Sequence, residues 1–305
     1  MNAGVQRLLW IGRNVADLDR AVAFYCDALG FRVEQSAEVA PLTWPSLQGI
    51  VKPPTRSARL SLGSQRIELS EFPDAIPYPP GATSADLCFQ HCAVVVNDMD
   101  AAYARLLQHG GGTAISTEGP QRLPPTSGSV TAFKFRDADG HPLELISFPL
   151  GSGDRVWQQH AGGPTLGIDH IAISVSNVER SITFYRLLGF EISSRSVNRG
   201  AEQQRLDGLA QVEVDVIALQ PGMAETPHLE LLGYRIPYGR KFPNVGACAI
   251  SADRVALKTR SLPVLLDKLG DENASHVTTS LIVSTKIPQI AWLSDPDGHW
   301  LVLIE

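Results

Sequence analysis

The 305-residue sequence lacks several features that would each have narrowed its function. It has no cluster of Lys and Arg, and its formal net charge is −6, so we expect neither nucleic acid nor an anionic membrane as a partner. It has no uncharged apolar stretch of about 18 residues and no basic segment leading into one near residue 1, so a cytoplasmic protein is expected. A hydrophobic content of 44% can still fill two ordinary cores.

Cysteine is also scarce, with four residues and no CxxC pair. A disulfide framework or a cysteine-based zinc site is therefore not expected. The stretch CFQHC at 88–92 is no exception, because side chains alternate along a strand. Cys88 and Cys92 would face one side and His91 the other, so they do not share an ion.

An internal repeat dominates what is present. Residues 170–190 (HIAISVSNVERSITFYRLLGF) match residues 91–111 (HCAVVVNDMDAAYARLLQHGG): an apolar strand, then Asn177 or Asp98 as a helix N-cap seven residues after the His, then an amphipathic helix that ends at Gly. Residues 10–31 form a third copy. A weaker fourth copy covers 246–270, with Asp253 aligned to the cap position.

Each copy is followed by strands that end on a carboxylate or its replacement. The segments 135–148 and 293–305 share an Asp-x-Asp-Gly turn between strands, and 66–72 and 228–234 are the matching ends of the other two copies. The sequence thus predicts four modules at about 5–74, 88–149, 166–233 and 244–305. We expect an N-terminal domain at 1–150, a linker at 151–165 and a C-terminal domain at 166–305.

The motifs HIAISVSN, FYRLLGF and DPDGHW resemble those of the vicinal oxygen chelate superfamily, which includes glyoxalase I, extradiol dioxygenases and bleomycin resistance proteins. The resemblance covers nearly the whole chain. It implies an α+β fold in which four βαβββ modules form two cup-shaped, eight-stranded mixed sheets with helices outside. It also implies metal ligands on the first and last strands of each module.

Aligning the four copies gives two such positions per module. They hold Trp10 and Glu68, His91 and Glu144, His170 and Glu230, and Gly246 and Val302. If modules pair in chain order, one cup has Glu68, His91 and Glu144 and the other has His170 and Glu230. If module two pairs with three and module one with four, a single cup has His91, Glu144, His170 and Glu230. We favour the second arrangement, because one assumption then explains why intact ligands occupy adjacent modules.

Two imidazoles and two carboxylates suit one divalent ion of Fe, Co, Ni, Mn or Zn and leave positions for water or a bidentate substrate. Such an ion favours a small substrate with adjacent oxygens, whose developing enolate it stabilises. By resemblance to glyoxalase I, Glu144 is the candidate general base. Substrate-binding residues are not predicted, although Tyr234, Arg235, Tyr238 and Arg240 form either a loop over the cup or a plain surface loop. Trp10 is expected to fill the second cup, and His141 and His299 to face solvent.

Three functions remain open on the sequence alone. The leading one is a metal-dependent lyase or isomerase of the glyoxalase type. The second is an Fe(II) extradiol ring-cleaving dioxygenase acting on a catechol-like substrate, although Gly246 and Val302 break the usual pattern of those enzymes. The third is a non-catalytic protein that binds a small molecule, as drug-resistance members do. The chain is expected to be a monomer or a homodimer.

Overall fold

The four predicted repeats are present in the computed structural model, which describes residues 4–37, 53–110, 112–158, 163–222, 226–243, 246–271, 280–282 and 289–305. Module one contains β1 (Val5–Val15), α1 (Leu18–Asp27), β2 (Arg32–Ala37), β3 (Ser57–Leu62) and β4 (Gln65–Glu71). Module two contains β5 (Gln90–Val96), α2 (Met99–Gln108), β6 (Thr113–Ala114), β7 (Gln121–Arg122), a 3₁₀ turn η1 (Pro125–Ser127), β8 (Thr131–Arg136) and β9 (Pro142–Ser147).

A second 3₁₀ turn, η2 (Arg155–Gln158), lies between the two halves of the chain. Module three contains β10 (Thr165–Ser174), α3 (Val178–Leu187), β11 (Phe190–Arg199), α4 (Ala201–Asp207), β12 (Glu213–Pro221) and β13 (His228–Ile236). Module four contains β14 (Arg254–Thr259), α5 (Leu262–Asp271), β15 (Ser280–Ile282), β16 (Ile290–Ser294) and β17 (Trp300–Ile304).

The predicted helix N-caps explain where α2 and α3 begin. The Asp98 carboxylate accepts a hydrogen bond from the backbone N–H of Ala101 at 2.9 Å, and the Asn177 side chain accepts one from Arg180 at 3.0 Å. The prediction for module four was wrong. Helix α5 begins at Leu262, so Asp253 lies before β14 and caps no helix.

Two mixed sheets are built across the halves of the chain. The central-module sheet (modules two and three) has the order β11-β12-β13-β10-β5-β9-β8-β6, and the outer-module sheet (modules one and four) has the order β15-β16-β17-β14-β1-β4-β3-β2. In each, the first strands of the two modules pair antiparallel at the centre, β10 with β5 and β1 with β14. The favoured pairing of two with three and one with four is therefore confirmed.

The strand count differs slightly from the expected eight per sheet. The central-module sheet gains a ninth strand, because the two-residue β7 pairs with β8 at Gln121 and Arg122 beside the main path. The predicted α+β class and the modular layout are otherwise as expected from the sequence.

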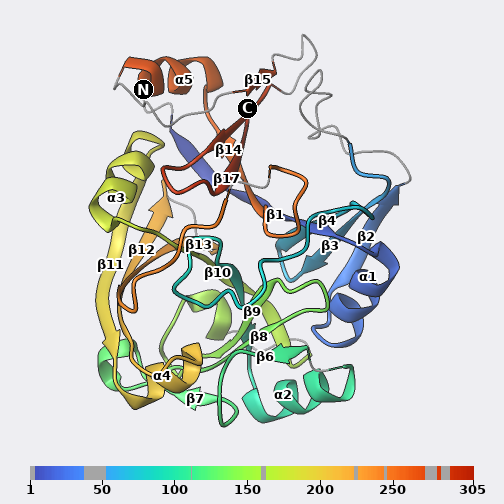
Figure 1. Ribbon diagram of the computed structural model, residues 1–305, viewed down its shortest axis with the longest axis vertical. Coiled ribbons are helices and arrows are strands. Elements are labelled where there is room, and N and C mark those ends of the chain that lie inside the picture. Colours follow the sequence, from blue (N-terminus) through green and yellow to red (C-terminus); the bar gives the residue numbers. More distant parts are fainter. Residues whose placement is uncertain are drawn as a thin grey trace.

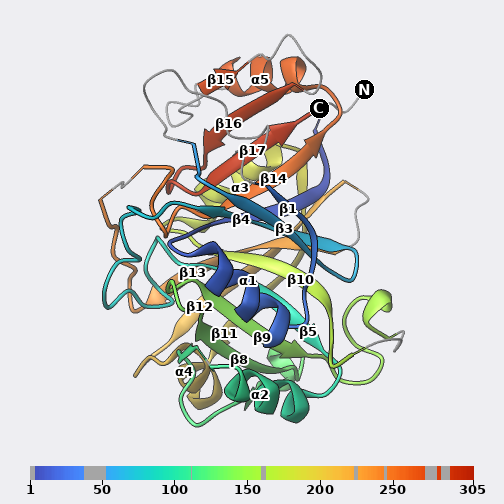
Figure 2. The same ribbon diagram turned by 90° about the vertical axis from the view of Figure 1, so that its right-hand side faces the viewer.

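One large apolar core holds the two sheets and the helices together. Figures 1 and 2 show the outer-module sheet stacked above the central-module sheet, with α1, α2, α3 and α5 at the periphery. Ile67 from one sheet and Leu145 from the other belong to this core, together with Tyr25 of α1 and Tyr185 of α3. Outside this core, side chains of the central-module sheet line a cavity, and side chains of the outer-module sheet form a separate buried cluster.

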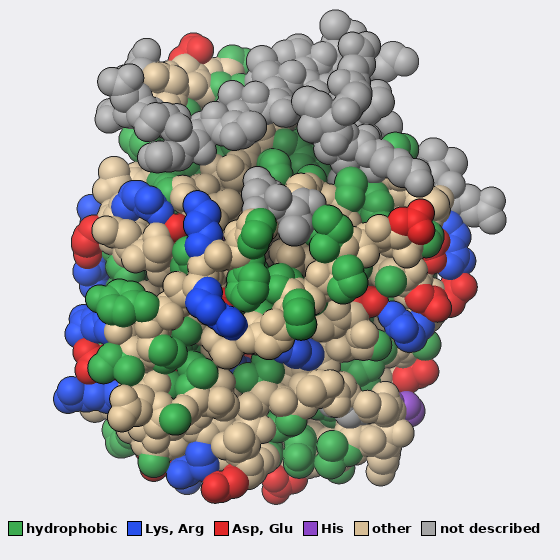
Figure 3. All heavy atoms as spheres, viewed as in Figure 1, with side chains coloured by type: hydrophobic (Ala, Val, Ile, Leu, Met, Phe, Trp, Pro, Cys, Tyr) green, Lys and Arg blue, Asp and Glu red, His purple; other side chains and the backbone are tan. Residues whose placement is uncertain are grey.

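The surface carries charges of both signs. On the face in Figure 3, Lys and Arg side chains are scattered among Asp, Glu and apolar side chains. No helix in the described part of the chain combines the length and apolar composition needed to cross a bilayer.

Candidate active site

The four predicted ligands all line one cavity of 460 Å³ on the concave face of the central-module sheet. They are His91 on β5, Glu144 on β9, His170 on β10 and Glu230 on β13. Strand register brings them together. Ala93 lies between His170 and Glu144 in one cross-strand row, and Ala172 lies between His91 and Glu230 in the next. These buried alanines leave room for the longer side chains to lean toward one another.

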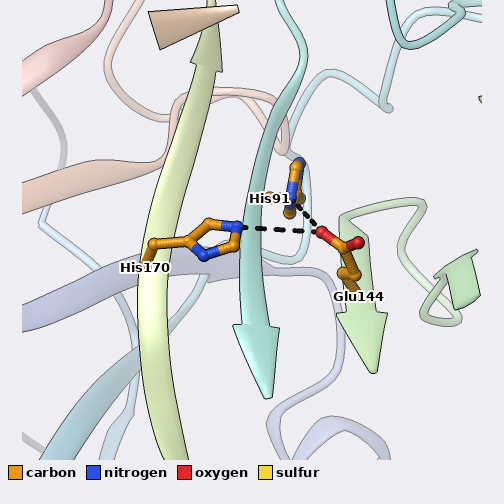
Figure 4. A group of neighbouring side chains, drawn as sticks. All are labelled: His91, Glu144 and His170. Carbon is orange, nitrogen blue, oxygen red and sulfur yellow. Dashed lines mark hydrogen bonds and ion pairs between the residues drawn. The ribbon is translucent and has the colours of Figure 1, made fainter. Parts of the chain in front are cut away.

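Three of the four meet at a point (Figure 4). His91 Nε2 donates a hydrogen bond to Glu144 Oε2 at 2.8 Å, and His170 Nε2 lies 3.7 Å from the same oxygen. The ligand atoms of this trio all lie within 4.8 Å of one another. Glu230 joins through His170, whose Nε2 is 3.5 Å from Glu230 Oε2.

The electrostatics of this group suit a cation. Burial opposes ionisation of Glu144, but hydrogen bonds from His170 and His91 outweigh it and hold the pKa of the carboxyl well below its usual range. Glu230 behaves alike: burial raises its pKa, yet the His170 charge and the His228 hydrogen bond lower it to about 2. Burial lowers the pKa of His91, whereas the surrounding carboxylates raise that of His170 well above its usual value despite burial. His170 thus carries positive charge between ionised carboxylates.

The donor set fits a divalent ion on these observations. Metal bonds of about 2.0 to 2.2 Å place neighbouring ligand atoms roughly 3 Å apart, close to the 2.8, 3.5 and 3.7 Å separations in this group. Two imidazole nitrogens and two carboxylate oxygens are ligands that Fe, Co, Ni, Mn and Zn accept. His91 Nδ1 is buried and has no hydrogen-bond partner in the structure.

A second potential ligand group shares His170. Asp169, His170 and His228 also bring their ligand atoms within 4.8 Å of one another. His228 Nε2 donates to Glu230 Oε1 at 3.4 Å, and its Nδ1 lies 3.9 Å from Asp169 Oδ2. Neither Asp169 nor His228 was predicted as a site residue.

The rest of the cavity wall combines apolar side chains with small hydroxyl side chains. Ile146, Val216 and Leu232 contribute apolar surface, and Ser193 and Ser196 contribute hydroxyls. The cavity is large enough for a small organic substrate beside the ligand group.

A buried lysine faces the same cavity. Lys134 on β8 pairs with Glu144 in the strand register, and its Nζ donates a 2.7 Å hydrogen bond to the buried Asp207. Tyr234 donates to the other oxygen of Asp207 at 3.0 Å. Burial lowers the pKa of Lys134, but the charges of Asp207 and Glu144 outweigh it and raise the pKa.

Of the four residues that the sequence placed either over the cup or in a surface loop, one lines the cavity and three do not. Tyr234 lines the cavity, whereas Tyr238 is 84% exposed. Arg235 makes ion pairs with Asp215 and Glu213 at 2.6 and 2.7 Å, and Arg240 pairs with Asp86 at 2.7 Å. Neither Arg235 nor Arg240 lines this cavity.

The outer cup carries an arginine where the central cup has its first histidine. Register places Arg254 opposite Gly12, as His91 lies opposite Ala172. The alignment of Gly246 to this position was therefore wrong, because β14 and α5 begin eight residues later than the sequence suggested (262 against 254). The Arg254 guanidinium lies 3.4 Å from Glu68 Oε1 and donates to Ser70 and Asn14 at 2.7 Å each.

The remaining outer-cup positions are filled as an apolar plug. Val302 and Trp292 belong to a buried cluster against which Trp10 packs, in agreement with the expectation that Trp10 fills this cup. Arg59 lies 5.0 Å above the Trp10 ring and 3.2 Å from Glu68. Glu68 is thus bound by two arginines and lies in the other sheet from His91 and Glu144.

The expectation that His141 and His299 face solvent was wrong. His141 is fully buried, with Nδ1 bonded to Asp137 at 2.9 Å and Nε2 donating to the carbonyl of Ile250 at 3.0 Å. His299 donates from Nε2 to the carbonyl of Ser174 at 2.9 Å. His141 links its turn in module two to module four, and His299 links its turn in module four to module three.

Two of the residues missed at the site, Asp169 and Lys134, share a signal. Asp169 stands in the apolar run 166–173, and Lys134 stands among Ala132, Phe133 and Phe135. A lone charge in such a strand is costly to bury unless it is paired, so each pointed to a polar partner inside the protein. Asp207, which ends α4, gave no comparable signal.

Comparisons with known proteins agree with this architecture. The family profile described as Glyoxalase/Bleomycin resistance protein/Dioxygenase superfamily matches residues 7–145 and 167–303. Lactoylglutathione lyase GLX1 of Arabidopsis thaliana is 24% identical over 305 residues, which cover 98% of this chain and 92% of that protein. The Salmonella typhimurium lactoylglutathione lyase is 27% identical over 46% of this chain and 91% of its own length. The crystal structure of glyoxalase I from Zea mays has the same fold, with a TM-score of 0.64, 19% identity and coverage of 98% and 92%.

Proposed function

The chain belongs to the glyoxalase, bleomycin resistance protein and dioxygenase superfamily, and from this premise we propose that it is a metal-dependent lyase or isomerase of the glyoxalase type. The observation that carries the proposal is the trio of His91, Glu144 and His170, whose ligand atoms lie within 4.8 Å of one another in the wall of a single cavity. Curated relatives named lactoylglutathione lyase, aligned over nearly the whole chain, support the same activity.

The proposed ligands are His91, Glu144, His170 and Glu230, which would hold one divalent ion of Fe, Ni, Co, Mn or Zn. When bound, such an ion supplies a Lewis acid that stabilises negative charge on a substrate oxygen. Two ionised carboxylates balance its charge, so the site favours a small substrate with adjacent, uncharged oxygens.

Glu144 is the proposed catalytic residue. Its carboxylate is ionised and buried, and so it can accept a proton from a carbon next to the substrate carbonyl and return it to the neighbouring carbon. Glu144 is buried, and apolar side chains such as Ile146 and Leu232 line the cavity, which limits the access of water to the carboxylate. In the same isomerisation the substrate's hydroxyl proton passes to the former carbonyl oxygen, so the reaction has no net gain or loss of protons.

The charges on the cavity wall favour a substrate with an uncharged body. Among the described lining residues the Lys and Arg side chains are those of Lys134 and Arg195, and each is bound to a carboxylate, Asp207 at 2.7 Å and Glu179 at 3.0 Å. A substrate carboxylate entering the cavity would have to displace one of these partners or lose its water uncompensated. The proposed substrate class is accordingly a neutral hydroxyketone or similar compound with adjacent oxygens.

A second candidate is an Fe(II) ring-cleaving dioxygenase acting on a catechol-like substrate. The specific observation in its favour is that the group of His91, Glu144 and His170 consists of two histidines and one carboxylate, the set that non-haem Fe(II) oxygenases use. This reaction consumes oxygen, whereas proton transfer does not, so the two candidates separate in one assay.

The test begins with the metal content of protein purified without added ions. About one divalent ion per chain is expected, lost in a His91→Ala, His170→Ala double variant and retained in a Glu68→Gln control from the other cup. Activity is then measured without oxygen, on a neutral hydroxyketone and on the hemithioacetal of glutathione with a 2-oxoaldehyde, and oxygen uptake is measured with a catechol and Fe(II). Anaerobic turnover supports the isomerase, and oxygen uptake alone supports the dioxygenase. A protein that binds no ion with or without supplementation contradicts both and leaves the non-catalytic binder.

A further inference from the structure

Asp169 faces the cavity although its neighbour His170 does so too. On a regular strand, successive side chains point to opposite faces. β10 departs from this rule, because its pairing with β5 shifts register between Ile168 and His170. Such a bulge re-aims a side chain. Asp169 and His170 consequently both line the cavity.

Both carboxylate oxygens of Asp169 have a specific partner. Oδ2 accepts a hydrogen bond from His170 Nδ1 at 3.0 Å, and Oδ1 accepts one from the indole Nε1 of Trp157 at 2.7 Å. The Trp157 ring is 4% exposed and packs against the backbone of Gly167, where a Cβ would come within 2.8 Å of it. Trp157 therefore fixes one oxygen of the Asp169 carboxylate, and His170 fixes the other.

Trp157 comes from the connection between the two halves of the chain, in the turn η2. Two hydrogen bonds, from Trp157 to Asp169 and from His170 to Asp169, thus join the segment between the two halves to the proposed ligand His170. A linker that only tethered two domains would not need a buried indole aimed at a carboxylate.

The other cup provides an internal comparison. β1 has the same register shift against β14, between Leu8 and Trp10. Leu9 occupies the position of Asp169 there, and Trp10 that of His170. The bulge is thus common to both cups, but the carboxylate accompanies the histidine only where the histidine is present.

We infer that Asp169 and Trp157 are positioning residues that fix the orientation and tautomer of His170 for metal binding. The inference rests on the proposed function. Asp169 accepts a hydrogen bond from the proton-bearing Nδ1 of His170, and Nε2 is then the nitrogen that faces His91 and Glu144. Trp157 keeps the carboxylate from rotating toward solvent.

The experiment measures Co(II) binding to the full chain directly, by its visible absorption and by competition with a chelator. Asp169→Ala is expected to weaken Co(II) affinity by about 10- to 100-fold, as loss of a carboxylate behind a metal-bound histidine does. Asp169→Asn keeps an acceptor oxygen and should lose less. Trp157→Phe removes only the indole donor and should weaken affinity by about fivefold. Trp300→Phe, the same substitution in the outer cup, is the matched control and should bind Co(II) like the wild type.

The outcomes separate this inference from the function it rests on. If the wild type binds no Co(II), the proposed function fails. If the wild type binds but the Asp169 and Trp157 variants keep its affinity and absorption spectrum, the positioning role is overturned, even where their melting temperatures fall. Should Asp169→Ala not fold, Asp169→Asn and Trp157→Phe still decide the matter. In the Zn(II)-loaded wild type, long-range ¹H–¹⁵N spectra should place the His170 proton on Nδ1; a proton on Nε2 contradicts the inference.

Discussion

Replacing Glu144 with Gln separates its two proposed roles more cleanly than removing the side chain. The substitution conserves volume and keeps a carbonyl oxygen within reach of His91 Nε2, 2.8 Å from the present carboxylate. What is lost is the negative charge and the ability to accept a proton. Because the site is buried and lined partly by apolar groups, water is a poor substitute for the missing base.

The expected effect falls on turnover. A positioned general base contributes about 10²- to 10⁴-fold to rate, or roughly 3 to 5 kcal/mol of barrier, so kcat of Glu144→Gln should fall by about 10³. KM should change by no more than about threefold, since the walls that contact the substrate are unchanged. The lost charge also weakens ion binding, and both proteins must therefore be assayed at saturating ion with the bound ion counted.

The assay is initial-rate kinetics of anaerobic isomerisation, with kcat and KM determined separately at equal metal occupancy. Glu68→Gln is the matched control, because it removes a buried carboxylate from the corresponding surface of the other sheet. Its kcat should stay within about twofold of the wild type. Retention of wild-type kcat by a fully loaded Glu144→Gln protein refutes the assignment of Glu144 as the base.

Two further predictions concern stability. Glu68→Leu removes the carboxylate that lies 3.4 Å from the buried Arg254 guanidinium and should lower the free energy of unfolding in urea by about 3 to 5 kcal/mol. The double variant Glu68→Leu, Arg254→Met should recover most of this loss. Additive losses in the double variant contradict the pairing. Burial opposes protonation of His141, but the charges of Asp137 and Asp253 raise its pKa above the unfolded value of about 6.5. The contribution of protonated His141 to the free energy of unfolding is therefore full below about pH 6.5 and is lost as the pH rises through the folded pKa. The stability difference between wild type and His141→Asn should therefore shrink on raising the pH above about 6.5, and a difference independent of pH counts against the argument.

The sequence predicted the central cup because its signals there are local and repeated. His91 and His170 each stand seven residues before a helix cap, and strand periodicity then fixes which neighbours share their face. The cross-half pairing followed from where intact ligands cluster, and the strand order confirms it.

The errors arose where tertiary contacts decide the outcome. Module four lacks the histidine that anchors the other alignments, so Gly246 was aligned in place of Arg254, and only the strand register corrected this. His141 and His299 follow polar turns and look like surface residues in one dimension. They are buried because their Nε2 atoms find carbonyl partners 109 and 125 residues away, a fact that no local pattern encodes.

Asp169 illustrates a third kind of limit. Regular strand alternation would place Asp169 on the face opposite His170, but a single register shift in β10 brings both side chains to the cavity. Bulges depend on how two strands meet, so a strand read alone gives no warning of them. The only sequence signal was the cost of a carboxylate in an apolar run.

The outer cup explains why only one of two similar sheets is proposed to carry chemistry. Its cation is the Arg254 guanidinium, bound to Glu68 and seated over Gly12, where a Cβ would meet the Arg254 side chain at 2.5 Å. A guanidinium keeps its proton at neutral pH and offers no vacant position to a ligand, so it can neutralise a carboxylate but cannot act as a Lewis acid. It is also covalently part of the chain and needs no supply of ions. Apolar side chains around Trp292 fill the rest of the outer cup, which supports the fold. The central cup takes His91 and Glu144 from one half of the chain and His170 and Glu230 from the other. The proposed activity therefore depends on both halves folding together.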